Sequence, residues 1–156
     1  MRHWRVGPLH AARAAMKDGI PQRVKASTSV TRDSAWNGAI PIAKLPRLAA
    51  NLTGAEGELQ AELHASRDVA GAATLKGWIS GALGLVCQTC MKPFSWPLQA
   101  ELALRLVNSE VEEKRLLPEC EPLLVEDDTL HLHALIEEEA LLALPIAPRC
   151  AACAKE

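Results

Sequence analysis

Two pairs of cysteines carry the clearest chemical signal in this sequence. Cys87 and Cys90 form one Cys-x-x-Cys pair, and Cys150 and Cys153 form a second. Zinc prefers four thiolates at the corners of a tetrahedron, and a Cys-x-x-Cys turn supplies two of them. The pairs lie about sixty residues apart, further than in a compact zinc ribbon. A shared four-cysteine zinc site, two unrelated pairs, and a surface pair that oxidises therefore all stay open.

Other residue patterns argue against catalysis. The first cysteine pair does not open a helix within a βαβ pattern, so a thioredoxin-like role is not expected. His131 and His133 are two residues apart, which places them on different faces of a helix and disfavours a shared metal site. The sequence has no nucleotide-binding loop, nucleophile elbow or catalytic-triad spacing. We therefore predict that the protein is not an enzyme and has no small-molecule substrate.

Charge is distributed unevenly along the chain. Residues 1–49 hold nine Lys or Arg and two Asp, a net charge of +7, whereas the remainder has a net charge of −9. A basic segment on an acidic body suggests a nucleic-acid contact or a partner with its own charge pattern, and a solvated N-terminus is the plain alternative. The candidate contact residues in the basic segment are Arg2, Arg5, Arg13, Lys17, Arg23, Lys25 and Arg32.

The candidate acidic surface is a run of three glutamates, Glu137, Glu138 and Glu139. Such a run most often forms a solvated helix face. Its functional interpretation is a contact for a basic partner, such as a ribosomal protein.

Composition limits the class of protein. The 156 residues suit one domain, and its core must be aliphatic because 49% of residues are hydrophobic but only 3% are aromatic. The absence of Tyr and the single Phe weaken any interpretation based on aromatic stacking of bases. No secretory signal and no membrane-spanning run is recognisable, so we expect a reducing, cytoplasmic setting. The Arg-rich opening would also suit an organelle-targeting peptide, or a true start at Met16.

Alternating polar and apolar residues predict the strands that must position the first cysteine pair. The pattern is found over residues 58–65 and 96–107, and residues 75–86 are a further strand candidate whose three glycines suggest bulges or strong bending. The second and third of these strands should form an antiparallel hairpin, because only a short turn separates them. Cys87 and Cys90 would then lie at the tip of the hairpin.

Helical spacing predicts three helices. A short basic helix is expected over residues 11–17, a second over 40–52, and an acidic one over 130–144 that is capped by Asp128 or Thr129. Together with the strands, these helices predict an α+β fold. Its antiparallel sheet would be partly closed and barrel-like, with a short N-terminal helix and an acidic C-terminal helix.

Polar stretches divide the chain. Residues 1–38 are expected to form a basic, flexible N-terminal arm, and 39–156 a single α+β domain. Within the arm, residues 19–38 carry loop signals. Residues 108–118 are charged and polar, so we expect an exposed, mobile loop there.

The order of these motifs resembles a known family. Residues 87–93 read Cys-Gln-Thr-Cys-Met-Lys-Pro and precede an alternating strand and an acidic loop. Residues 128–132 read Asp-Thr-Leu-His-Leu, and 135–145 read Leu-Ile-Glu-Glu-Glu-Ala-Leu-Leu-Ala-Leu-Pro, followed by Pro148. In this order the chain resembles the bacterial YceD family, the large ribosomal RNA subunit accumulation proteins, over roughly Ile40–Cys153.

The resemblance implies a non-enzymatic role in the accumulation, processing or stability of 23S rRNA, and so in assembly of the large ribosomal subunit. The implied partners are large-subunit rRNA or a precursor ribosomal particle, together with a basic ribosomal protein. Many relatives carry further cysteines after the final proline block, which supports one structural zinc ion held by both cysteine pairs. The alternative function is a zinc-stabilised module that binds a basic protein partner and never touches RNA.

Overall fold

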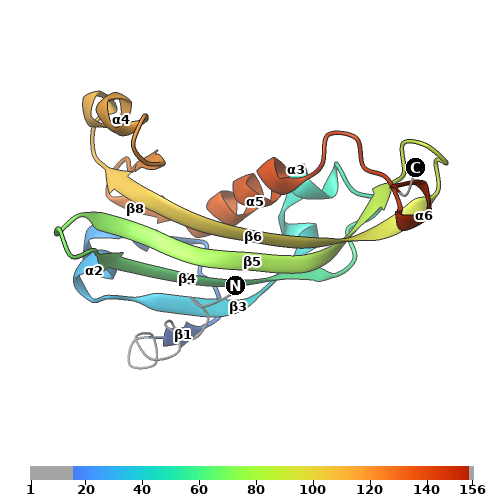
Figure 1. Cartoon of the computed structure of the whole chain (residues 1–156). Helices are drawn as coiled ribbons and strands as arrows, with labels where there is room; N and C mark the ends of the chain where they lie inside the picture. Colours follow the sequence, from blue (N-terminus) through green and yellow to red (C-terminus); the bar gives the residue numbers. More distant parts are fainter. Residues whose placement is uncertain (1–15, 155–156) are drawn as a thin grey trace.

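The centre of the protein is a curled, mixed β-sheet, seen in a computed structural model that describes residues 16–154 (Figure 1). The strand order is β1-β3-β4-β5-β6-β7. The strands are β1 (Met16–Asp18), β3 (Ala35–Pro41), β4 (Glu58–Arg67), β5 (Ala73–Val86), β6 (Pro93–Val107) and β7 (Pro122–Leu124). The sheet curls into a half-barrel, and helix α5 (Leu132–Ala143) packs against β6. The predicted α+β fold class is therefore confirmed.

Strand side chains alternate between the core and the solvent. On β6, Leu98, Leu102 and Leu104 are buried, whereas Gln99 and Glu101 are exposed. On β4, the apolar residues of the alternating pattern are all buried, namely Leu59, Ala61, Leu63 and Ala65. Alternation of this kind puts every second side chain on one face of a strand, so one face of the sheet can form an aliphatic core.

Strands β5 and β6 form the predicted antiparallel hairpin. Their pairing runs without interruption from Thr74 opposite Arg105 to Val86 opposite Pro93. The connecting turn, residues 87–92, therefore lies at the far end of the ladder and carries the first cysteine pair. Figure 1 shows this turn beside the C-terminal segment.

The sheet is mixed, so the expectation of a purely antiparallel sheet is wrong. Strand β1 pairs parallel to β3, and β7 pairs parallel to β6. Each of these edge strands has three residues. A segment of that length is too short for an alternating pattern to be recognised in the sequence.

Residues 19–38, which were expected to be loop, contain regular elements. Strand β2 (Arg23–Lys25) pairs antiparallel with β8 (Thr129–His131) to form a second, two-stranded sheet. Helix α2 (Ala26–Thr31) follows, and its Val30 is buried in the core. The expected domain boundary at residue 38 falls within β3.

The dipeptide Asn37-Gly38 is a common turn signal, but it lies within strand β3. The main chain at Gly19 crosses close to β3, and its N–H donates to the carbonyl oxygen of Asn37 at 2.6 Å. A Cβ atom at Gly38 would lie 2.8 Å from the Gly19 Cα. Glycine is therefore required at position 38 for close approach of two backbone segments, and not for a turn.

The expectation of a mobile loop over residues 108–118 is also wrong. Helix α4 spans Glu110–Leu116 and places acidic residues in its first turn and basic residues in its last. Ser109 caps the helix, because its Oγ accepts a hydrogen bond from the N–H of Glu112 at 3.2 Å. The Ser-x-x-Glu pattern is a capping signal, and favourable charges at both ends add to it. The sequence therefore contained the evidence for this helix.

The helix expected over residues 11–17 is not found at its end, where Met16 and Lys17 lie in strand β1, and residues 11–15 lie outside the described part of the chain. The other two expected helices agree with the sequence in position but not in extent. In place of one helix over 40–52, the chain forms the short 3-10 helix η2 (Ile42–Lys44) and then α3 (Pro46–Ala49), with Pro46 in its first turn. Helix α5 begins after His131, so neither Asp128 nor Thr129 caps it. Instead, Asp128 accepts hydrogen bonds from the backbone N–H and hydroxyl of Ser27 at 2.8 and 2.6 Å, which joins α2 to the turn before β8.

Glu137 of α5 holds the first turn of α3. Its side chain is buried, and Oε2 accepts hydrogen bonds from the N–H groups of Arg47 at 2.6 Å and Leu48 at 3.0 Å. These N–H groups belong to the first turn of a helix and have no partner within it. The carboxylate therefore replaces an N-cap side chain that the α3 sequence lacks.

We expect Glu137→Ala to lower the free energy of unfolding by about 1–3 kcal/mol, because the buried N–H of Leu48 and the partly buried N–H of Arg47 lose a charged acceptor. The matched control is Glu138→Ala. Glu138 is exposed and reaches only the Arg47 guanidinium, so its removal should change stability by less than about 0.5 kcal/mol. Urea denaturation of both variants measures the difference, and equal stabilities would contradict the assigned role.

Candidate metal centre

The turn after β5 folds around the sulfur atom of Cys87. The Cys87 N–H donates to the carbonyl oxygen of Lys92 at 2.9 Å, and the N–H of Met91 donates back to the Cys87 carbonyl oxygen at 2.9 Å. The N–H groups of Thr89 and Cys90 approach the Cys87 sulfur at 3.4 and 3.5 Å. A turn that aims backbone N–H groups at one sulfur favours that sulfur as a thiolate.

The second cysteine pair reaches the first through the proline segment that follows α5. The N–H of Gln88 donates to the carbonyl oxygen of Pro148 at 2.8 Å, which attaches this segment to the hairpin turn. Helix α6 (Ala151–Ala154) follows, and the N–H of Cys153 donates to the Cys150 carbonyl oxygen at 3.1 Å. The guanidinium of Arg149 donates to the carbonyl oxygen of Cys153 at 3.0 Å, which closes the turn.

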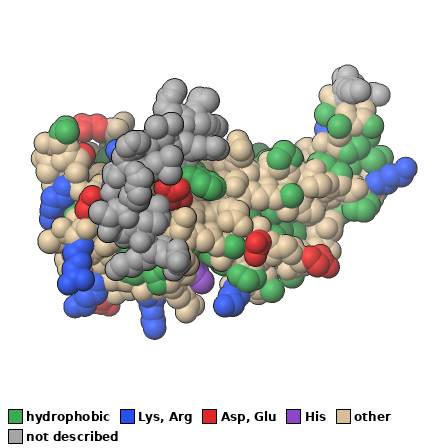
Figure 2. All heavy atoms as spheres, turned by 90° about the horizontal axis from the view of Figure 1, so that it is seen from below, with side chains coloured by type: hydrophobic (Ala, Val, Ile, Leu, Met, Phe, Trp, Pro, Cys, Tyr) green, Lys and Arg blue, Asp and Glu red, His purple; other side chains and the backbone are tan. Residues whose placement is uncertain are grey.

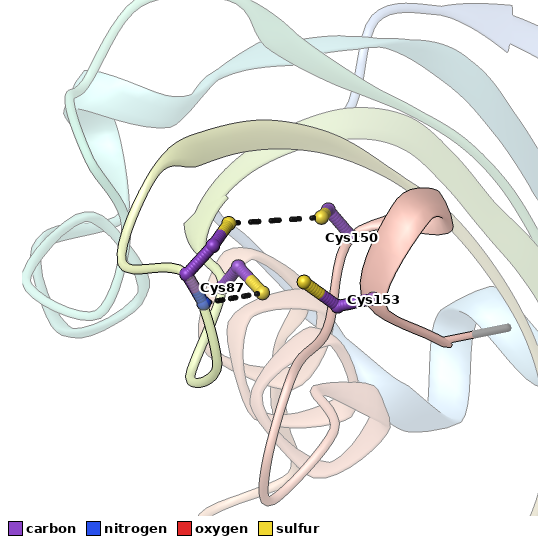
Figure 3. Close-up of side chains that lie close together, drawn as sticks. Cys87, Cys150 and Cys153 are labelled. Carbon is purple, nitrogen blue, oxygen red and sulfur yellow. Dashed lines mark hydrogen bonds between the residues drawn. The ribbon is translucent and has the colours of Figure 1, made fainter. Parts of the chain in front are cut away.

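All four sulfur atoms lie within 4.8 Å of one another. The Cys90 and Cys150 sulfurs are 3.9 Å apart. Sulfurs at the corners of a tetrahedron about 2.3 Å from a zinc ion would be about 3.8 Å apart, so the donor set fits such an ion in type and spacing. Figure 3 shows Cys150 and Cys153 turned towards the hairpin turn that carries Cys87.

Two of the clustered thiols differ strongly in pKa. Hydrogen bonds from the backbone N–H groups of Cys90 and Cys150 lower the pKa of the Cys87 thiol from its ordinary 9.0 to about 5. Hydrogen bonds with the side chains of Cys150 and Cys87 raise the pKa of the Cys153 thiol to about 12. The Cys87 sulfur therefore ionises readily, whereas the Cys153 sulfur keeps its proton. A divalent cation bound by the four sulfurs would favour their thiolate forms.

The structure therefore brings the two cysteine pairs together in one cluster that could hold a metal ion. Cys87 is buried, Cys90 is exposed, and Cys150 and Cys153 are partly exposed. Cys120, the fifth cysteine, follows α4 and lies outside the cluster.

The basic candidate residues lie away from the cysteine cluster. Arg23 and Lys25 are exposed on β2, and Arg32 is exposed at the end of α2. Figure 1 shows α2 at one end of the molecule and the cluster at the other, and in Figure 2 Lys and Arg side chains gather at the end that holds α2. Lys17 lies in β1. Three further candidates lie outside the described residues, namely Arg2, Arg5 and Arg13.

The three glutamates of α5 do not form one open surface. Glu137 is buried and bonded to α3, while Glu138 is exposed and forms an ion pair with Arg47 at 3.2 Å. Burial and the neighbouring charges of Glu121 and Glu138 raise the pKa of Glu139. Glu121, which precedes β7, is an acidic neighbour of α5 that no sequence pattern predicts.

The two histidines of this region belong to different elements, His131 to β8 and His133 to α5. His131 is exposed on β8, and Nε2 of His133 lies 2.8 Å from the carbonyl oxygen of Ile20. Within residues 16–154, no helix combines the length and hydrophobicity needed to cross a membrane.

Comparison with known proteins identifies the family of the chain. The family model described as "Large ribosomal RNA subunit accumulation protein YceD" matches residues 75–156. No solved structure gives a significant match. The matched residues cover more than half of the chain and include the hairpin, α5 and all four clustered cysteines. The chain therefore belongs to the YceD family of large ribosomal RNA subunit accumulation proteins.

Proposed function

We propose that this protein is a non-catalytic factor that supports the synthesis, processing or stability of 23S rRNA during assembly of the large ribosomal subunit in the cytoplasm. The family match over residues 75–156 carries this proposal. The segment common to the family contains both cysteine pairs, so the cluster belongs to the part of the protein that the family shares.

In this proposal the cysteine cluster holds one structural zinc ion. Cys87, Cys90, Cys150 and Cys153 supply four sulfur ligands, which fill the coordination shell of zinc and leave no position for a substrate or water. The ion would act as a crosslink between the hairpin turn and the segment after α5. That role is structural and agrees with a protein without catalysis.

The proposed RNA contact uses the exposed basic residues near α2. Arg23, Lys25 and Arg32 are exposed there, and the basic N-terminal residues precede them in the chain. Lys and Arg bind the phosphate backbone without regard to sequence, and the affinity falls as salt rises because bound counterions are released. The sparse aromatic content favours phosphate contacts over base stacking.

A second candidate function is a zinc-stabilised module that binds a basic protein and has no RNA contact. The observation that favours it is the acidic group formed by Glu121, Glu138 and Glu139, in which burial and then the charges of Glu121 and Glu138 raise the pKa of Glu139. Crosslinking in cells separates the two functions. Recovery of rRNA supports the first, and recovery of protein alone supports the second.

We expect the purified protein to contain one zinc ion per chain, and Cys87→Ser and Cys150→Ser each to lose it. Loss of the crosslink should lower the melting temperature by about 10 °C. Cys120→Ser is the matched control, because this cysteine lies outside the cluster and its replacement should leave zinc content unchanged. Metal analysis and thermal unfolding measure both effects. Zinc lost in Cys87→Ser but kept in Cys150→Ser would show that the two pairs do not share an ion.

A deletion strain should accumulate less 23S rRNA relative to 16S rRNA, and the protein should sediment with precursors of the large subunit. The double variant Arg23→Glu/Lys25→Glu should weaken this association and reduce the slope of log affinity against log salt by about 1.4–1.8. The control is Lys44→Glu/Lys114→Glu, which reverses two exposed charges outside β2 and α2. Unchanged 23S rRNA in the deletion strain would refute the proposed function.

A further inference from the structure

Within the described residues, one edge of strand β6 has no paired strand along most of its length. Strand β7 covers this edge only opposite Arg105–Val107. Among residues 16–154, no strand pairs with the same edge between Pro93 and Leu104. A row of backbone N–H and C=O groups at a sheet edge is a template for a further strand.

The hydrogen bonds at the two ends of β6 show which residues face the open edge. At one end, the N–H of Arg105 donates away from β5, to the carbonyl oxygen of Glu121 at 2.9 Å. At the other, Lys92 faces Cys87 across the hairpin and bonds to it at 2.9 Å. Successive residues of a strand alternate between its two neighbours, so the odd-numbered residues of β6 direct their N–H and C=O groups outward. These residues include Gln99, Glu101 and Ala103.

Prolines protect one part of this edge and leave another part free. Pro93 and Pro97 occupy the outward-facing series and have no N–H to offer, which is a common way to block edge pairing. The seven residues from Leu98 to Leu104 contain no proline. Gln99, Glu101 and Ala103 thus form an unblocked row of three donors and three acceptors, and their side chains are exposed.

Three acidic side chains lie in or near this unblocked row, while Lys76 of β5 faces Ala103 and Arg105 follows the row on β6. Glu101 lies within it, and Glu121 lies where β7 begins, since its carbonyl oxygen bonds to Arg105. Glu139 of α5, the helix that packs against β6, is close enough to Glu121 for their charges to interact. An incoming strand with Lys or Arg side chains would complement these charges. A phosphate backbone would be repelled, and a second copy paired about Glu101 would place like charges opposite each other.

We propose that the open edge of β6 from Gln99 to Ala103 binds an extended, Lys- or Arg-bearing segment of a protein partner by strand addition. This inference rests on the proposed function, which places the protein among proteins that bind rRNA. Such proteins carry basic segments that remain disordered until they are bound. Backbone hydrogen bonds supply the affinity in this binding mode, and the flanking charges select the partner.

The hairpin is well suited to this role because its other contacts hold the edge in place. The ladder to β5 fixes one side of β6, and Leu98, Leu102 and Leu104 pack into the core beneath it. Strand β7 already pairs with the last residues of the same edge, so the geometry of that edge accepts an added strand. A new strand would extend the sheet beyond the point where β7 stops.

The test uses the full-length protein and a short capped peptide in which Lys alternates with Val. The same peptide with Glu in place of Lys is the charge control. We expect only the Lys peptide to bind, and to slow hydrogen exchange at the amides of Gln99, Glu101 and Ala103. The amides of Ala100 and Leu102 bond to β5 and should be protected with or without peptide, which gives an internal reference.

Proline substitution at the outward positions tests the backbone contribution. Gln99→Pro/Ala103→Pro should weaken peptide binding by about tenfold or more, because two donors are lost. Gln99→Val/Ala103→Val keeps both N–H groups and should bind as the natural protein does. Pro93 and Pro97 show that β6 accepts proline in this series, and the amide measurement on the natural protein stands independently if the proline variant misfolds.

Three outcomes would overturn the inference. In the first, the Lys peptide binds but does not protect the three amides. In the second, the Glu peptide or an RNA oligonucleotide protects these amides equally well. In the third, the chain dimerises through this edge. In cells, the deletion strain and the Gln99→Pro/Ala103→Pro variant are compared. If 23S rRNA falls in the deletion strain but stays normal in the variant, the edge contact is refuted and the proposed function is retained. Normal 23S rRNA in both strains would refute the proposed function itself.

Discussion

The uninterrupted backbone ladder between β5 and β6 is the interaction on which the other features of the molecule depend. It carries the chain to the turn that holds Cys87 and Cys90, it presents a row of leucines to α5, and it sets which backbone groups face the open edge. The side-chain period of a strand is two residues, so a shift of register by one residue would turn Leu98 and Leu102 towards solvent. The core, the cysteine cluster and the edge are therefore fixed by one pairing register.

The part of the fold that could be predicted from the sequence is the part with sustained periodicity. Strands β4 and β6 show sustained alternation, β5 is a long segment with few breaks in its strand character, and the hairpin follows from the short turn between β5 and β6. Strands of three residues carry no such signal, and β2 and β8 are defined only by each other. Helix α4 is a different case, because the Ser109 cap was visible in the sequence but was outweighed by the polar composition around it.

The two Cys-x-x-Cys pairs could be recognised in the sequence, but their proximity in the folded protein could not be predicted from it. This proximity depends on how α5 directs the proline segment back to the hairpin, where Gln88 bonds to Pro148. The role of Glu137 was hidden for a similar reason, since its partners Arg47 and Leu48 lie about 90 residues away in the chain. A run of acidic residues looks uniform in the sequence. Packing against α3 gives one member of the run a structural role and leaves the others to the surface.

The long separation of the two cysteine pairs has a consequence for the order of events during synthesis. The hairpin that carries Cys87 and Cys90 leaves the ribosome before the segment with Cys150 and Cys153 has been made. At roughly 5–20 residues per second, the intervening stretch takes roughly 3–12 s to synthesise. During that interval the nascent hairpin has only one of the two cysteine pairs. The zinc site proposed above would therefore require the first pair to stay reduced for several seconds.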